Sequence, residues 1–109
     1  PVYARAAQLG FPRLLIPEAY GGIGGSCMDH VLVMEEFGAA DHGIAASYFN
    51  VSATAPLILL RGGTPAQAAH WLPEMAAAED FILASASSEP DVAGADSFCP
   101  DPDPAIGLK

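Results

Sequence analysis

The stretch SCMDHVLVMEEFGAADHGIAASYFNVSATAPLILL, residues 26–60, indicates a helical fold. Ser26 is a candidate helix N-cap, and Asp29 stands three residues later as the carboxylate partner of a capping box. From residue 28 to residue 40 the apolar side chains recur at helical spacing, with Val31, Met34 and Phe37 on one stripe. We therefore expect a helix over residues 28–40.

The second half of this stretch predicts another helix, over residues 44–60. The residues after Gly43 are apolar nearly all round, and a helix of this kind is expected to be buried on several sides. Pro56 lacks a backbone N–H and should kink or divide the helix. The run is about long enough to span a bilayer. Its polar side chains and the lack of a flanking basic cluster favour a buried helix, so we predict no membrane span.

The residues before this stretch extend the helical pattern towards the N-terminus. Residues 2–9 are compatible with a helix that stops at Gly10. Leu14, Leu15 and Ile16 should form a short extended piece, because a residue before proline disfavours the helical conformation. A glycine-rich loop follows at residues 20–25, without the pattern of a phosphate-binding loop.

The residues after residue 60 predict a last helical segment and then a strand. Thr64 should cap a short helix with Pro65 at its first position, and the pattern continues to about residue 79 with Trp71 as a core anchor. Residues 81–86 form the first convincing strand. Helices followed by a strand predict a mainly α fold: a helical domain over residues 1–80, then the beginning of a β-domain and an irregular tail over residues 81–109.

The composition excludes several classes of partner. The chain has 109 residues, of which 51% are hydrophobic, enough for one small core. Its mean hydropathy of +0.31 indicates apolar surface meant for another domain or subunit. The net charge of −9 disfavours nucleic acid and anionic membranes as partners. The histidines are too dispersed for a metal site and are expected to be capping or surface residues, and the two cysteines are expected to be free thiols.

Candidate binding chemistry lies in the turn after the predicted strand. Ser85, Ser87 and Ser88 place three hydroxyls at the strand end, and Gly94 permits close approach of the backbone. A flavin needs donors at its pyrimidine edge and an uncluttered backbone beside its pyrophosphate. From these residues alone, a ligand site and an ordinary capped turn both remain open.

Four segments, in conserved order across about residues 8–97, resemble the acyl-CoA dehydrogenase family. They are GFPRLLIPEAYGGIG at residues 10–24, VMEEFGAAD at residues 33–41, PLILLRGGTPAQ with WLP at residues 56–67 and 71–73, and SEP with GAD at residues 88–90 and 94–96. The resemblance implies a helical N-terminal domain of acyl-CoA dehydrogenase type, followed by the first strand of a β-barrel-like middle domain.

The resemblance also implies an activity, namely FAD-dependent α,β-dehydrogenation of an acyl-CoA thioester. Electrons would leave through an electron-transfer flavoprotein. The base that removes the α-proton belongs to the C-terminal domain of the family, so the resemblance assigns no catalytic residue to this chain. It further implies a homo- or hetero-oligomer, usually a tetramer, in the cytoplasm, or in the mitochondrial matrix of a eukaryote.

By position, the resemblance assigns two groups of binding residues. The flavin contacts would be Ser85, Ser87, Ser88, Gly94 and Ala95, with the Ser88 hydroxyl on the flavin ring. The wall of the acyl-chain cavity would include Ala45, Tyr48, Phe49 and Ser52.

Two departures from the family pattern lie near Gly94. There is one additional residue between Pro90 and Gly94, and alanine replaces the usual serine at residue 95. These departures and the proline-rich tail leave an alternative open: a truncated, non-catalytic paralogue that serves as a helical interaction subunit.

Overall fold

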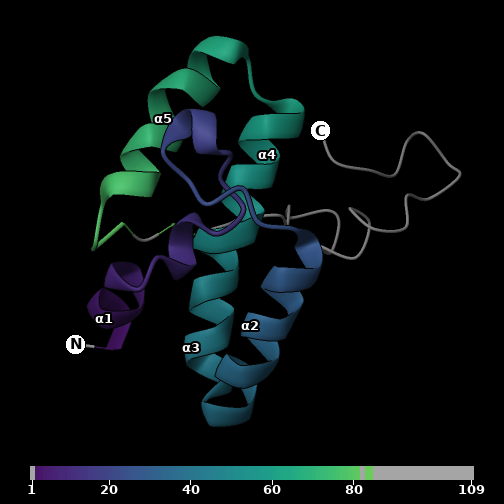
Figure 1. Ribbon diagram of the computed structural model, residues 1–109, viewed down its shortest axis with the longest axis vertical. Coiled ribbons are helices and arrows are strands. Elements are labelled where there is room, and N and C mark those ends of the chain that lie inside the picture. The colour runs from purple at the N-terminus through teal and green to yellow at the C-terminus, as the bar shows by residue number, and fades with distance from the viewer. Residues whose placement is uncertain (1, 82, 85–109) are drawn as a thin grey trace, which may run out of the picture.

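The computed structural model describes residues 2–81, 83 and 84, and these residues form a helical unit without strands (Figure 1). The mainly helical fold predicted from the sequence is confirmed. Phe81, Leu83 and Ala84 have no regular secondary structure, and the rest of the predicted strand at residues 81–86 lies outside the described residues. The helices are α1 (Val2–Gln8), α2 (Cys27–Ala40), α3 (His42–Phe49), α4 (Ala55–Gly62) and α5 (Pro65–Ala77).

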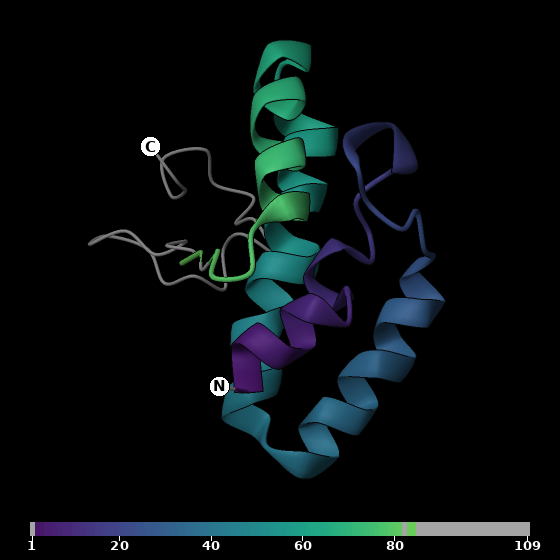
Figure 2. The ribbon, with the colours of Figure 1, turned by 60° about the vertical axis from the view of Figure 1, so that its left-hand side comes forward.

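The unit is built around one long column made of α3, a π-helical turn η3 (Asn50–Thr54) and α4. In both ribbon views α2 runs beside the α3 half and α5 beside the α4 half, while α1 lies near the lower part of the column (Figures 1 and 2). Two 3₁₀ turns, η1 (Phe11–Arg13) and η2 (Glu18–Tyr20), connect α1 to α2.

The π-turn explains how Pro56 is accommodated inside this column. In a regular α-helix the N–H of residue 56 would donate to the carbonyl of residue 52, and proline has no N–H to donate. Here the Ala55 N–H reaches back to the Asn50 carbonyl, which widens the helix just before Pro56. The predicted break is therefore a local widening, and the column continues from His42 to Gly62.

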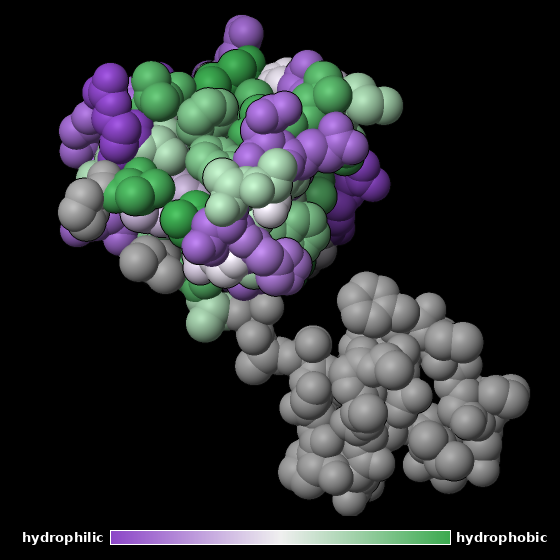
Figure 3. Space-filling model, turned by 90° about the horizontal axis from the view of Figure 1, so that it is seen from below, coloured by the Kyte–Doolittle hydropathy of each residue, from purple (hydrophilic) through white to green (hydrophobic). Residues whose placement is uncertain are grey.

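The column is less buried than the sequence predicts. His42–Gly62, 21 residues, is long and apolar enough to cross a membrane by length and composition, yet only 28% of its most apolar stretch is buried. Tyr48 and Val51 face the interior, whereas Phe49 is 51% and Ile58 61% exposed. Figure 3 shows apolar side chains among polar ones on the lower face of the unit. This apolar surface agrees with the high mean hydropathy of the sequence.

Two clusters form the core. Ile16, Ala68, Leu72 and Met75 make one between α5 and the α1–α2 connection; Ala6, Tyr48 and Val51 make the other between α1 and the column. Along α5 the buried residues Ala68, Leu72 and Met75 recur at helical spacing and form the inward face. Trp71 lies off this face and is 42% exposed. The prediction of Trp71 as a core anchor is therefore wrong, and its neighbour Leu72 takes that place.

Both predicted helix starts are confirmed. At Ser26 the hydroxyl accepts from the Asp29 N–H, and the Asp29 carboxylate accepts from the Ser26 N–H at 2.7 Å. Thr64 and Gln67 form the same reciprocal pair at the start of α5. The Ser26 hydroxyl also donates to the Asp29 carboxylate, and this bond, with the one from the Ser26 N–H, holds the pKa of Asp29 below its usual value.

The connection between α1 and α2 begins with a turn at Gly10. Gly10 has a φ of +90°, as expected for the glycine that ends a helix. Leu14 is helical and its N–H donates to the Phe11 carbonyl, and the Ile16 N–H donates to the Arg13 carbonyl. Residues 14–16 therefore form a turn, and the predicted extended piece is wrong. At Gly22 a Cβ would lie 1.9 Å from the Ile16 carbonyl oxygen, so the close approach of the two backbone segments requires glycine here.

Candidate functional site

The predicted flavin contacts Ser85, Ser87, Ser88, Gly94 and Ala95 lie outside the described residues and stay predictions. The structure does describe the chain that leads to them. Phe81 and Leu83 are partly buried and pack against both core clusters. They also line an apolar pocket of about 280 Å³ together with Ala55, Ile58, Leu59, Trp71 and Met75.

The four predicted acyl-cavity residues all belong to the column but differ in exposure. Tyr48 is fully buried and Ser52 is 1% exposed, while Ala45 is 9% exposed. Phe49 is 51% exposed and is the one large side chain of the four that remains accessible. Thus the structure withdraws Tyr48 into the core and leaves Phe49 at the surface.

Ser52 belongs to a buried polar pair with His30 of α2. The Ser52 hydroxyl donates to the Tyr48 carbonyl at 2.6 Å, so its oxygen accepts from His30 Nε2, 2.8 Å away. This arrangement places a proton on Nε2 of His30. Burial lowers the pKa of His30, which favours the neutral form. His30 was expected at the surface or in a cap; it is 5% exposed, and that prediction is wrong.

Tyr48 lies in a row of aromatic rings that joins α1, α2 and α3. Its ring stacks on Tyr3 with centroids 4.8 Å apart and on Phe37 with centroids 4.9 Å apart. Phe37 in turn meets Phe11 edge-on at 5.3 Å. Burial and the neighbouring Tyr3 raise the pKa of Tyr48 to about 12, so its hydroxyl stays protonated at neutral pH.

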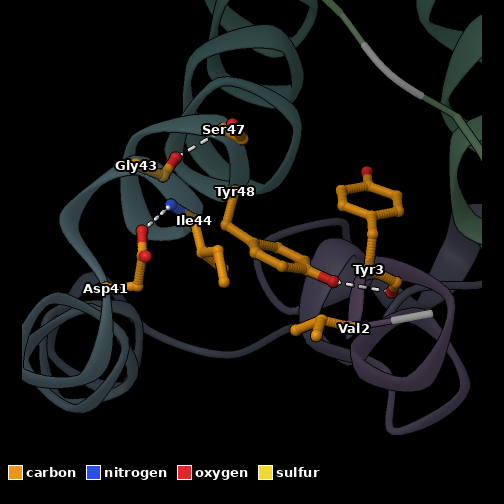
Figure 4. Close-up of a pocket in the computed structure, with 7 residues that line it drawn as sticks. All are labelled: Val2, Tyr3, Asp41, Gly43, Ile44, Ser47 and Tyr48. Carbon is orange, nitrogen blue, oxygen red and sulfur yellow. Dashed lines mark hydrogen bonds between the residues drawn. The ribbon is translucent and has the colours of Figure 1, made fainter.

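A pocket of about 390 Å³ lies between α1 and the start of α3 (Figure 4). The Tyr48 side chain reaches across it and donates to the Tyr3 carbonyl at 2.7 Å. The polar groups on the α3 side are already paired: Asp41 accepts from the Ile44 N–H, and Ser47 donates to the Gly43 carbonyl. The polar interactions drawn here therefore stabilise the helical unit itself.

The described residues offer no obvious catalytic base or metal centre. No group of three or more His, Cys, Asp and Glu side chains able to hold a metal gathers within this part of the chain. His30 is buried, with its Nε2 paired to Ser52. Glu35 and Glu36 are adjacent on α2, so they project about 100° apart and do not face one another.

Two residues that organise this region had no signal in the sequence. Tyr3 lies in a short helix whose pattern indicates only helicity, and His30 directly precedes Val31, the first residue of the apolar stripe of α2. Their partners are 45 and 22 residues away in the chain. Only the tertiary fold brings these pairs together.

Comparison with known proteins places the chain in a family. The sequence model described as acyl-CoA dehydrogenase, N-terminal domain, matches residues 1–79. The chain is 37% identical over 94 residues to mitochondrial isovaleryl-CoA dehydrogenase of Pongo abelii, covering 86% of this chain and 22% of that protein. An acyl-CoA dehydrogenase of Mycobacterium tuberculosis is 40% identical over 97 residues, covering 88% of this chain and 24% of that protein.

A third relative is named for a different substrate. The (2S)-methylsuccinyl-CoA dehydrogenase of Cereibacter sphaeroides is 41% identical over 73 residues, covering 67% of this chain and 13% of that protein. The chain thus spans about a quarter or less of the length of these relatives, and no solved structure matches it significantly. The match over residues 1–79 shows that this chain belongs to the acyl-CoA dehydrogenase family, through its N-terminal domain.

Proposed function

We propose that this chain supplies flavin and acyl contacts of an FAD-dependent acyl-CoA dehydrogenase. The reaction removes hydrogen from the α and β carbons of an acyl-CoA thioester and passes electrons to an electron-transfer flavoprotein. The observation that carries this proposal is the family match over residues 1–79, directly followed in sequence by a cluster of serines. The base is proposed to come from outside these residues, since the described residues provide none.

The donor set of residues 85–95 suits a flavin by its chemistry. Ser85, Ser87 and Ser88 supply hydroxyl donors for the polar edge of the ring, and Gly94 and Ala95 are small enough to lie beside a pyrophosphate. When bound, FAD supplies the hydride acceptor. The role proposed for this chain is to hold and orient the ring against the acyl thioester.

The acyl group is proposed to be short and branched. Two of the relatives are named for isovaleryl-CoA and (2S)-methylsuccinyl-CoA, both short branched acyl groups. In this chain the proposed cavity wall presents the large ring of Phe49, because the Tyr48 side chain is occupied in the core. A large ring at this position shortens the space left for a straight chain.

A flavin test separates this proposal from its alternative. We expect the purified protein to carry flavin absorbance that an acyl-CoA bleaches, and Ser88→Ala to weaken FAD binding about tenfold through loss of one hydrogen bond to the ring. Ser47→Ala, which removes an exposed hydroxyl from α3, is the matched control and should leave FAD binding unchanged. A colourless protein that takes up no FAD contradicts the proposal.

A test of acyl specificity uses the holoenzyme. Phe49→Ala should raise kcat/KM for octanoyl-CoA relative to isovaleryl-CoA by about tenfold, since it opens space along the chain. Ile58→Ala removes another exposed apolar side chain from the same column and serves as the control. An unchanged ratio in Phe49→Ala argues against Phe49 as part of the acyl wall.

The alternative is a non-catalytic helical interaction subunit. Its supporting observation is the set of large apolar side chains that the helical unit exposes, which need covering by another protein surface. These side chains are Val2, Leu9, Ile23, Met28, Val31, Leu32, Phe49, Ile58 and Trp71. Failure to bind FAD combined with stable association with another subunit would favour this alternative.

A further inference from the structure

Helices α4 and α5 together present an apolar surface to the outside. They lie side by side in the upper half of the unit (Figure 1). On this surface Ile58 of α4 is 61% exposed and Trp71 of α5 is 42% exposed. Both side chains line the pocket of about 280 Å³ described above. Large apolar side chains around an open apolar pocket are typical of a surface that binds another protein.

The Trp71 ring is already ordered at this surface. His70 meets it edge-on, with the ring centroids 4.7 Å apart, and this contact restricts the rotation of the indole. A side chain that is ordered before binding loses little conformational freedom when a partner covers it. Trp71 is therefore well suited to be a central contact of an interface.

Charges of opposite sign flank the two apolar side chains. Arg61 follows Ile58 by three residues on α4, and Glu74 follows Trp71 by three residues on α5. Residues three apart lie on the same side of a helix, so each charge is beside its apolar neighbour. Both charged residues are exposed, and within the part of the chain that the structure describes neither side chain forms an ion pair.

The antiparallel course of the two helices sets the direction of these charges. Ala55 at the start of α4 and Met75 near the end of α5 line the same pocket, so the helices run in opposite directions. Three residues of a helix rise about 4.5 Å along its axis. Arg61 and Glu74 therefore lie at similar distances on opposite sides of the apolar centre.

This surface is also the one that a second copy of an acidic chain could approach with little repulsion. The net charge of −9 opposes contact between copies in general. Helix α2 carries Asp29, Glu35 and Glu36 and no Lys or Arg. The column, residues 42–62, contains no Asp or Glu, and Arg61 is its single Lys or Arg residue.

We propose that the α4–α5 surface is an interface between two copies of this chain, related by a two-fold axis that passes between Ile58 and Trp71. Under this symmetry every contact occurs twice, so Arg61 of one copy meets the partner's Glu74, and the partner's Arg61 meets Glu74 of the first copy. The apolar centre supplies most of the affinity, and the charges determine the relative direction of the two copies. This interface does not depend on flavin binding.

Sedimentation equilibrium of the purified chain between about 1 µM and about 100 µM tests the interface, and we expect a monomer–dimer equilibrium within this range. Arg61→Glu and Glu74→Arg each bring like charges together and should weaken dimerisation about tenfold. An equimolar mixture of the two variants should form a heterodimer with about the wild-type affinity, because each contact then joins opposite charges again. Glu35→Arg on α2 changes the net charge as Glu74→Arg does and should not weaken the dimer.

The apolar centre is tested separately. Ile58→Asp should weaken dimerisation at least about tenfold, whereas Leu32→Asp, which replaces a 54% exposed side chain of α2, should leave it unchanged. Circular dichroism verifies that both variants keep their helices. A wild-type chain that stays monomeric at every concentration overturns the inference and leaves the surface to a different protein. A dimer unaffected by Ile58→Asp, one weakened equally by Leu32→Asp, or a charge-variant mixture that stays monomeric also overturns it.

Discussion

His30 gives the helical unit a specific pH dependence at the scale of a single residue. Its folded-state pKa is lowered by burial below the usual 6.5, so below that pH the unfolded chain binds a proton that the folded chain does not. The unfolding free energy should therefore be unaffected by His30 above about pH 7 and should fall as the pH drops below 6.5. Urea unfolding between about pH 7.5 and about pH 5 measures this loss.

Two variants isolate the contribution of His30. His30→Gln keeps an amide donor for Ser52 but has no proton to gain, so it should flatten the dependence; His42→Gln, at an exposed position, should not. The Asp29 carboxyl does not interfere, because its lowered pKa affects stability only below its usual value of 3.8. A dependence that persists in His30→Gln would assign the titration to another group.

Two glycines should respond in opposite directions to the same substitution. Gly22→Ala would place a Cβ 1.9 Å from the Ile16 carbonyl oxygen, so the backbone must move, at a cost of about 3 kcal/mol of unfolding free energy. Gly38 lies in α2 with nothing within 4 Å of the position of a Cβ, and Gly38→Ala should stabilise the unit by about 0.5 to 1 kcal/mol. Urea unfolding of both variants measures whether each unfolding free energy rises or falls. A Gly22→Ala variant as stable as wild type would show that the backbones at Gly22 and Ile16 are not in close contact.

At the scale of elements, the helix starts could be predicted from the sequence because their cause is local. A capping box needs residues three positions apart, and the Ser26–Asp29 and Thr64–Gln67 pairs both form as expected. The inward face of α5 could not be predicted, because it depends on what packs against the helix. Trp71 and Leu72 are neighbours in sequence, but it is Leu72 that packs with Ile16 in the core.

This assignment of faces along α5 makes a direct prediction. Leu72→Ala removes a fully buried side chain and should cost about 3 kcal/mol of unfolding free energy through lost burial and the cavity left behind. Trp71→Ala removes a larger side chain that is 42% exposed and should cost less than about 1 kcal/mol. Thermal or urea unfolding of the two variants ranks them, and a larger loss in Trp71→Ala would restore tryptophan as the anchor.

At the scale of the whole molecule, the sequence marks the proposed flavin contacts more clearly than the residues that hold the helices together. The serines at residues 85, 87 and 88 are recognisable as a cluster because they are close in sequence. Tyr3 and His30 act through partners in other helices, so no local pattern marks them. The surplus of apolar residues does appear in the composition, and the structure places it on exposed positions such as Phe49 and Ile58.

The charge of the chain also acts at this largest scale. With 13 acidic against four basic residues, the net charge is −9, and this charge repels itself more strongly in the compact state than in the unfolded chain. Raising the salt concentration from about 0.01 M to about 0.15 M shortens the screening length from roughly 30 Å to roughly 8 Å. We expect the unfolding midpoint to rise by roughly 5 °C at neutral pH, which corresponds to about 1 kcal/mol for a domain of this size. The control is the same pair of salt concentrations near the isoelectric point of about 4.3, where the net charge vanishes and the midpoint should no longer respond. A midpoint that falls with salt at neutral pH would mean that favourable charge pairs outweigh the repulsion.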